Sequence, residues 1–206
     1  GGGNLLGVSQ SGNIAAIGYD LYLDLLQKTV ADLKAKSAQG DQEELMDDID
    51  PEINIQISAY IPATYIPDIS QRYITYRRMA ALTSTSQELL EDMKEELVDR
   101  YGSLPAEAIN LFRIVTLKKA LAGLRITKLE KGHDTLVFSF ASDTSLNPEK
   151  LMTYLQRHSS KRKNTAPRLT PGGRLIISRK MTSAEHIFGA ISATLNDLNS
   201  LTHASN

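Results

Sequence analysis

Side chains that could carry out catalysis are scattered along this sequence. The four histidines occur neither as HxxxH nor as HExxH, the spacings that place two metal-binding imidazoles on one helix face. They are His133, His158, His186 and His203. Cysteine is absent, and no serine lies in a nucleophile-elbow pattern. We therefore expect no catalytic residue and no metal site in this chain, and no enzymatic activity from this chain by itself.

A pair of acids is more informative. Glu96 and Asp99 are three residues apart in a stretch with helical periodicity, so they share one face of a helix. They lie towards its C-terminal end, where the helix dipole disfavours negative charge. Acids that local helix energetics does not favour indicate an external partner, and Arg100 follows them directly. The alternative is a solvated acidic face, which would also include Glu91, Asp92 and Glu95.

One basic stretch could contact phosphate groups. The cations proposed for nucleic-acid contact are Arg157, Lys161, Arg162 and Lys163. Further basic residues of the stretch are His158, Arg168, Arg174, Arg179 and Lys180. Clustered lysines and arginines are the electrostatic footprint of nucleic-acid binding. Only Tyr154 could add base stacking, so a loop that merely keeps the protein soluble is the alternative.

The chain opens with a glycine-rich stretch, residues 1–12, that contains no lysine. A phosphate-binding P-loop needs GxxxxGK followed by Ser or Thr, and that spacing is missing. Taken alone, this stretch favours a flexible terminus over a functional loop.

The stretch from Ile53 to Pro105 contains the clearest structural signals. Ile53, Ile55 and Ile57 alternate with polar residues, which predicts a half-buried strand. A helix beginning near Pro67 is expected to bury one face. That face comprises Ile69, Tyr73, Tyr76 and Ala80. A base-stacking role for the tyrosines is the alternative.

A second helix is expected to end at Gly102, a residue suited to a left-handed cap. Its buried stripe is predicted to comprise Leu90, Met93, Leu97 and Tyr101. A third helix would run from Pro105 to Ala122, with Lys118 and Lys119 suited to its C-terminal turn. Its inward residues would be Leu111, Ile114, Val115 and Leu121.

The remaining sequence mixes hairpins with helices. One hairpin turns at residues 131–134 and a second at residues 171–173, with helices expected near 147–155 and 183–201. Residues 14–36 predict a long N-terminal helix with a broad apolar face. This mixture predicts an α+β fold, a small mixed or antiparallel sheet packed with several helices.

Composition is that of an ordinary soluble domain. The 206 residues are 41% hydrophobic and 23% charged, with a formal net charge of −1. This balance gives no overall attraction to nucleic acid or membrane. An acidic stretch predicts boundaries between a first segment, 1–38, a linker, 39–51, and a domain, 52–206.

Several motifs occur together in one order. They are Tyr-Ile-Pro-Asp at 65–68, Arg72, Tyr-Arg-Arg at 76–78 and Glu-Leu-Val-Asp-Arg-Tyr-Gly at 96–102. In this order they resemble the C-terminal domain of bacterial transcription-repair coupling factor (Mfd). The resemblance covers nearly the whole chain and weakens after about Asp143.

The glycine-rich start resembles the translocation motif that follows the last helicase motif in this family and in the helicase RecG. The matching residues are Gly7, Gln10, Ser11 and Gly12. In those proteins the motif couples ATP hydrolysis to movement along duplex DNA. Val8-Ser9 stands where an acidic residue is common, and the arginine expected upstream of Gly1 is absent.

The resemblance implies a regulatory domain of an ATP-dependent DNA translocase that displaces stalled RNA polymerase and recruits nucleotide excision repair. Such a domain masks the UvrA-recruiting surface of a UvrB-like N-terminal module until the motor engages. Glu96 and Asp99 match the acids that face this module, and Arg100 and Tyr101 complete the motif. UvrA, RNA polymerase and duplex DNA are implied as partners of the parent protein, in the bacterial cytoplasm and with no membrane partner.

The resemblance also implies that ATP and Mg²⁺ belong to the parent motor, with no cofactor in this chain. Two other functions remain open. The basic stretch at 157–180 could make the chain a DNA-binding module, and its binding would then fall steeply with salt. The chain could also be a stabilising cap without a regulatory role.

Overall fold

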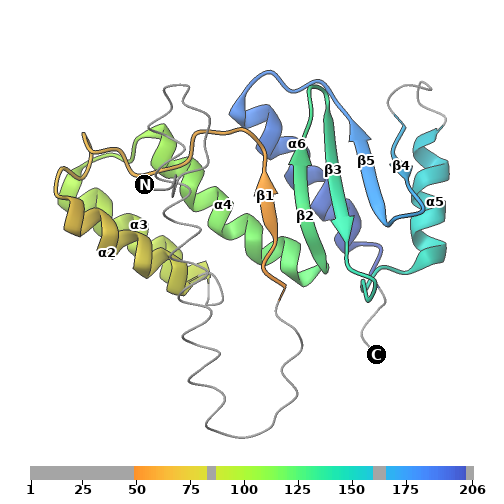
Figure 1. Ribbon diagram of the computed structural model, residues 1–206, viewed down its shortest axis with the longest axis horizontal. Coiled ribbons are helices and arrows are strands. Elements are labelled where there is room, and N and C mark those ends of the chain that lie inside the picture. The colour runs from red at the N-terminus through yellow and green to blue at the C-terminus, as the bar shows by residue number, and fades with distance from the viewer. Residues whose placement is uncertain (1–48, 83–86, 160–165, 203–206) are drawn as a thin grey trace, which may run out of the picture. The chain divides into compact units, whose positions relative to one another are not determined.

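The computed structural model describes residues 49–82, 87–159 and 166–202 (Figure 1). Its strands are β1 (Glu52–Asn54), β2 (Ile126–Lys131), β3 (Thr135–Phe140), β4 (Arg168–Leu169) and β5 (Arg174–Ser178). Its helices are α2 (Ile69–Leu82), α3 (Gln87–Tyr101), α4 (Ala106–Gly123), α5 (Pro148–Ser159) and α6 (Ala184–Asn199). The expected long N-terminal helix, the translocation motif and most of the acidic linker lie outside the described residues.

The described residues form two compact units. One unit is Ser58–Arg113, and the other combines the residues up to Ile57 with those from Ile114 onwards. The α4 helix contributes its first part to the helical unit and the rest to the sheet unit. The predicted boundaries at residues 38 and 51 stay predictions, because the structure does not describe residues 1–48.

The helical unit is built on α2 and α3, which lie side by side (Figure 1). The stripe of α3 is buried as predicted at Leu90, Met93 and Leu97, whereas Tyr101 is only half-buried. Gly102 ends α3 with a φ of 84° and donates its N–H to the Val98 carbonyl at 2.8 Å. A left-handed residue at this position caps the helix, and glycine adopts that conformation without steric strain.

The predicted inward face of α2 is wrong in part. Tyr76 and Ala80 are buried, but Ile69 is 72% exposed and Tyr73 is 43% exposed. The buried residues of α2 are Thr75, Tyr76, Met79 and Ala80. The helix carries apolar residues on both sides, so its sequence periodicity does not define a single buried face. Packing selects the face that includes Met79.

The hydroxyl of Tyr76 is a buried polar group of this unit. It accepts the backbone N–H of Ile61 at 2.7 Å. Burial raises the pKa of this hydroxyl, because the charged phenolate is disfavoured away from water. The Tyr76 side chain therefore satisfies a buried donor of the segment that precedes α2.

The sheet unit has a mixed sheet with the strand order β1-β2-β3-β5-β4. The β1 strand is parallel to β2, and all other neighbouring strands are antiparallel. Ile53, Leu129, Phe138 and Leu175 form one row of paired positions across the sheet, and all four are buried. This row lies on the core face, and the predicted α+β fold with a small mixed sheet is confirmed.

The first strand is shorter than its alternation predicts. Ile53 and Ile55 are both buried, but β1 ends at Asn54. Gln56 has a φ of 56°, a left-handed conformation that takes the chain out of the extended geometry of a strand. The predicted strand 53–57 is therefore wrong at its C-terminal end, although its burial pattern continues to Ile55.

The helices of the sheet unit begin at side-chain caps. Asn147 accepts the backbone N–H groups of Glu149 and Lys150 at the start of α5. Ser183 accepts the N–H of His186 at the start of α6. The α6 helix lies behind the sheet in Figure 1 and buries Ile187, Ile191, Leu195 and Leu198. Local capping and one apolar stripe thus stabilise this helix, which lies within the range 183–201 that the sequence predicts.

Candidate partner-binding surface on α2 and α3

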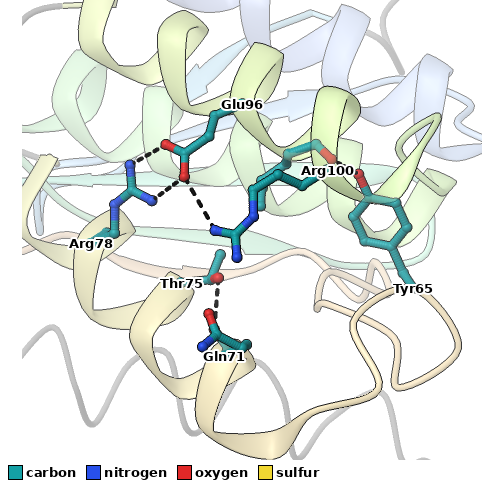
Figure 2. Close-up of polar contacts among 7 residues, drawn as sticks. Tyr65, Gln71, Thr75, Arg78, Glu96 and Arg100 are labelled. Atoms are coloured by element: carbon teal, nitrogen blue, oxygen red, sulfur yellow. Dashed lines mark hydrogen bonds and ion pairs between the residues drawn. The ribbon is translucent and has the colours of Figure 1, made fainter.

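Glu96 lies at the centre of an ion-pair network on the helical unit (Figure 2). Its Oε1 accepts from Nη1 of Arg78 at 2.9 Å, and its Oε2 accepts from Nη2 of the same arginine at 2.6 Å. Arg100 approaches Oε1 from α3 at 3.5 Å. Two parallel hydrogen bonds between a guanidinium and a carboxylate are the strong form of this pair. Both carboxylate oxygens of Glu96 are therefore engaged within the unit.

The Arg78–Glu96 pair shifts the pKa values of both of its members. The hydrogen bond from Arg78 holds the pKa of the Glu96 carboxyl below its usual value, and Arg100 adds a smaller effect in the same direction. The hydrogen bond to Glu96 raises the pKa of the Arg78 guanidinium. Each partner thus favours the charged form of the other. The side chains of Arg78 and Glu96 are 44% and 37% exposed, so water weakens this pair.

Arg100 is placed by two neighbours. Besides its contact with Glu96, its guanidinium carbon lies 5.2 Å from the centre of the Tyr101 ring. The Tyr101 ring lies 5.8 Å from that of Tyr65, whose hydroxyl donates towards the carbonyls of Leu97 and Gly102. A guanidinium over a tyrosine ring is weakly attracted to it at an exposed site. These contacts hold the side chain of Arg100 beside Glu96 and Tyr101, at the C-terminal end of α3.

Asp99 differs from Glu96. Its side chain is exposed, and within the described residues its carboxylate forms no hydrogen bond or ion pair. The charges of Arg78 and Arg100 outnumber that of Glu96 by one, so Asp99 returns the group to neutrality. Among the acids selected from the sequence, Asp99 is the one whose carboxylate is available to a partner.

The structure brings together the three residues selected from the sequence and adds one that the sequence reasoning missed. Glu96, Asp99 and Arg100 share the C-terminal half of α3, as their spacing requires. Arg78 is the addition, and it lies on α2, 18 residues before Glu96. The signal for it was present in the Tyr-Arg-Arg motif, but that motif does not show which acid an arginine contacts.

The proposed nucleic-acid residues are only partly described. Arg157 is exposed on α5, whereas Lys161, Arg162 and Lys163 lie outside the described residues. The other arginines of the stretch and Lys180 are exposed on or near β4 and β5. The His158 and Tyr154 rings are tilted by 44° with their centres 4.4 Å apart, and Nδ1 of His158 lies 2.9 Å from the Tyr154 carbonyl oxygen. The translocation residues Gly7, Gln10, Ser11 and Gly12 also lie outside the described residues.

The prediction for Lys118 is wrong. Lys118 and Lys119 were expected to suit the C-terminal turn of α4, but the helix continues to Gly123 and its last turn contains no basic residue. The Lys118 side chain is instead 4% exposed, and its Nζ lies 2.7 Å from Oδ1 of Asp50. Burial lowers the pKa of this ammonium group, and the Asp50 carboxylate opposes the shift. The partner lies 68 residues away in the sequence, so no local pattern could have indicated this pair.

The described part of the chain contains neither a metal-binding cluster nor a helix that could span a membrane. Within those residues, no group of three or more histidines and acids could hold a metal ion. No helix there is both long enough and apolar enough to cross a bilayer.

The fold and the motif region together place this chain in a known class of domain, the TRCF domain. Residues 55–151 match the TRCF domain family. The fold is similar to a solved structure described as the C-terminal domain of transcription-repair coupling factor. That likeness has a TM-score of 0.64 at 20% identity and covers 79% of this chain and 100% of the other.

Curated relatives identify the family. The chain is 34% identical over 199 residues, 96% of its length, to the transcription-repair-coupling factor of Myxococcus xanthus. It is 36% identical over 157 residues, 76% of its length, to that of Escherichia coli. The chain spans only 15% and 13% of the lengths of these two relatives. The chain belongs to the transcription-repair coupling factor family, and the resemblance seen in the motifs is confirmed.

Proposed function

We propose that this chain is a regulatory domain of a transcription-repair coupling factor, and that it binds the UvrB-like module of its parent protein through the end of α3. In this function the domain keeps the UvrA-recruiting surface masked until the motor engages RNA polymerase on DNA. The proposal extends the family membership to a mechanism. ATP and Mg²⁺ would act in the parent motor rather than in this chain.

The observation that carries the proposal is the exposed carboxylate of Asp99 beside the Arg78–Glu96–Arg100 network. The network engages both oxygens of Glu96, whereas Asp99 offers a negative charge without a partner in the described residues. A basic partner surface could bind there with electrostatic complementarity. Exposed ion pairs of this kind contribute about 0.2–1 kcal/mol each, so the clamp could open when the motor moves.

A binding experiment tests the proposal. The purified chain is titrated against the immobilised UvrB-like module and, separately, against duplex DNA at low and moderate salt. We expect binding to the module. The Asp99→Asn variant should bind about two- to fivefold more weakly, because one exposed ion pair is lost.

Glu88→Gln is the matched control. Glu88 is an exposed acid on the same helix and lies about 16 Å from Asp99 along the axis, so the substitution removes the same charge from a distant position. It should leave the affinity nearly unchanged. Equal weakening by both variants would indicate general charge attraction and would contradict a defined contact at the end of α3.

A DNA-binding module is the second candidate. Exposed arginines at β4 and β5, including Arg168 and Arg174, support it. In that case the chain should bind duplex DNA, and the affinity should fall steeply with salt. Binding to DNA but not to the module, unaffected by Asp99→Asn, would establish this function in place of the clamp.

A further inference from the structure

The Glu96 carboxylate has an internal partner that any external cation must displace or share. Arg78 occupies both carboxylate oxygens, at 2.9 and 2.6 Å, and Arg100 lies 3.5 Å from one of them (Figure 2). A carboxylate offers one edge to a guanidinium for two parallel hydrogen bonds. Arg78 already occupies that edge.

The pair is nevertheless exchangeable. The Arg78 and Glu96 side chains are both more than a third exposed, and the pair links two helices at the surface. Water can therefore solvate either partner after separation, so opening the pair leaves no buried unpaired charge. An external guanidinium could take the place of Arg78 on Glu96 at small cost.

We propose that Arg78 is an internal competitor that lowers the affinity of this surface for a basic partner. The partner's arginine or lysine replaces Arg78 on Glu96 while Asp99 receives a second cation. This inference rests on the function proposed above and specifies how that contact is regulated. It distinguishes the two acids: Asp99 is available at once, and Glu96 becomes available only when Arg78 leaves.

Arg77 provides a matched control. It is exposed, precedes Arg78 on α2, and within the described residues its side chain has no hydrogen bond or ion pair. Adjacent helical residues point about 100° apart, so Arg77 does not share the direction of Arg78 towards Glu96. Arg77→Met and Arg78→Met therefore change the charge equally, but only Arg78→Met removes the two parallel hydrogen bonds to Glu96.

The first measurement needs no partner. The pKa of the Glu96 side-chain carboxyl is followed by nuclear magnetic resonance in the whole chain. Arg78→Met should raise this pKa towards its usual value, because the largest cause of its lowering is removed. Arg77→Met should leave it nearly unchanged. An equal response to the two variants would overturn the internal pairing, whether or not the proposed partner binds.

The second measurement is the affinity for the immobilised UvrB-like module. Arg78→Met should bind about two- to fivefold more tightly than the unaltered chain and more tightly than Arg77→Met. The affinity of Arg78→Lys should lie between those of the unaltered chain and Arg78→Met, since an ammonium group keeps the charge but cannot form the paired hydrogen bonds. The chemical-shift dispersion in the nuclear magnetic resonance spectra confirms that each variant is folded.

A double-mutant cycle with Glu96→Gln separates competition from general charge. If Arg78 acts through Glu96, then Arg78→Met should no longer raise the affinity in the Glu96→Gln background. An undiminished gain there would overturn the competition. Failure of the unaltered chain to bind the module would instead contradict the proposed function, and the Glu96 titration would still test the internal pair.

Discussion

The two units of this chain contain ion pairs of opposite character. In the helical unit, Arg78 and Glu96 are joined at the surface, with both side chains more than a third exposed. In the sheet unit, Lys118 is 4% exposed and is paired with Asp50, whose side chain is 40% exposed. The exposed pair has two hydrogen bonds, whereas a single hydrogen bond of 2.7 Å joins the buried ammonium to its carboxylate.

The comparison shows that burial, and not the number of hydrogen bonds, decides whether an ion pair stabilises the fold or is available for binding. A surface pair can separate at little cost because water replaces each partner. A buried ammonium that loses its carboxylate remains as an uncompensated charge away from water, which is strongly unfavourable. The buried pair should therefore determine stability, and the exposed pair can be used for binding.

The largest effect is expected when Asp50, the more exposed partner of the buried pair, loses its charge. Asp50→Asn leaves the Lys118 ammonium buried without a counter-charge and should lower the free energy of unfolding by about 2–4 kcal/mol. This range lies somewhat below that of fully buried pairs, because water reaches Asp50. Urea denaturation of the whole chain near neutral pH measures it, with circular dichroism as the signal.

Lys118→Met is the control for this prediction. It removes the buried charge and leaves a half-exposed carboxylate that water can solvate, so the loss should stay within about 1 kcal/mol. If the two substitutions destabilise the chain equally, the cost does not come from the unpaired ammonium. The contrast drawn between the two units would then fail.

A smaller effect is expected from the buried hydroxyl of the helical unit. Tyr76→Phe removes the acceptor of the Ile61 N–H and leaves a buried donor unsatisfied, at a cost of about 1–3 kcal/mol. Tyr73→Phe is the matched control, since Tyr73 is 43% exposed on the same helix. Its effect should remain within about 0.5 kcal/mol. Thermal unfolding of both variants distinguishes a buried polar contact from a general loss of a hydroxyl.

The features predicted correctly are those determined by neighbouring residues. The stripe Leu90, Met93 and Leu97, the left-handed Gly102 and the two hairpin turns all follow from short patterns in the sequence. Such patterns state a period or a turn conformation without reference to distant residues. The α+β class followed from the order in which these elements occur.

The features predicted wrongly depend on distant contacts or on ambiguous patterns. Lys118 could not be assigned to Asp50 from any local spacing, because 68 residues separate them. The buried face of α2 was ambiguous because Ile69 and Ile74 are apolar but exposed. Packing resolves such an ambiguity only when the facing helix is known.

The candidate surface was found from the helical spacing of two acids and from the motif that contains them. The motif selected Glu96, Asp99 and Arg100, and the helix places all three on its C-terminal half. It treated the two acids as equivalent. Their difference comes from Arg78, which lies on another helix, so only the three-dimensional arrangement reveals it. Their binding role stays a prediction.

The smallest effect is expected from breaking the exposed pair. Arg78→Met should lower the free energy of unfolding by about 0.2–1 kcal/mol near neutral pH, because water solvates the separated Glu96. Arg77→Met is the control and should change it less. Urea denaturation of both variants beside Asp50→Asn gives a direct ranking. A loss from Arg78→Met as large as that from Asp50→Asn would mean that the surface pair is structural, which is incompatible with its exchange on binding.

The pH dependence of this loss has a definite sign. The pKa of Glu96 is lowered in the folded chain by Arg78, so the pair stabilises the fold above the unfolded pKa of 4.5. This stabilisation is lost as the pH falls through the lowered pKa, because the carboxyl then becomes neutral. The difference between the unaltered chain and Arg78→Met should therefore shrink when denaturation is repeated in acid. Arg77→Met breaks no such pair, so its free energy of unfolding relative to the unaltered chain should change less over the same pH range. A parallel change in both variants would assign the effect to net charge instead of to Glu96.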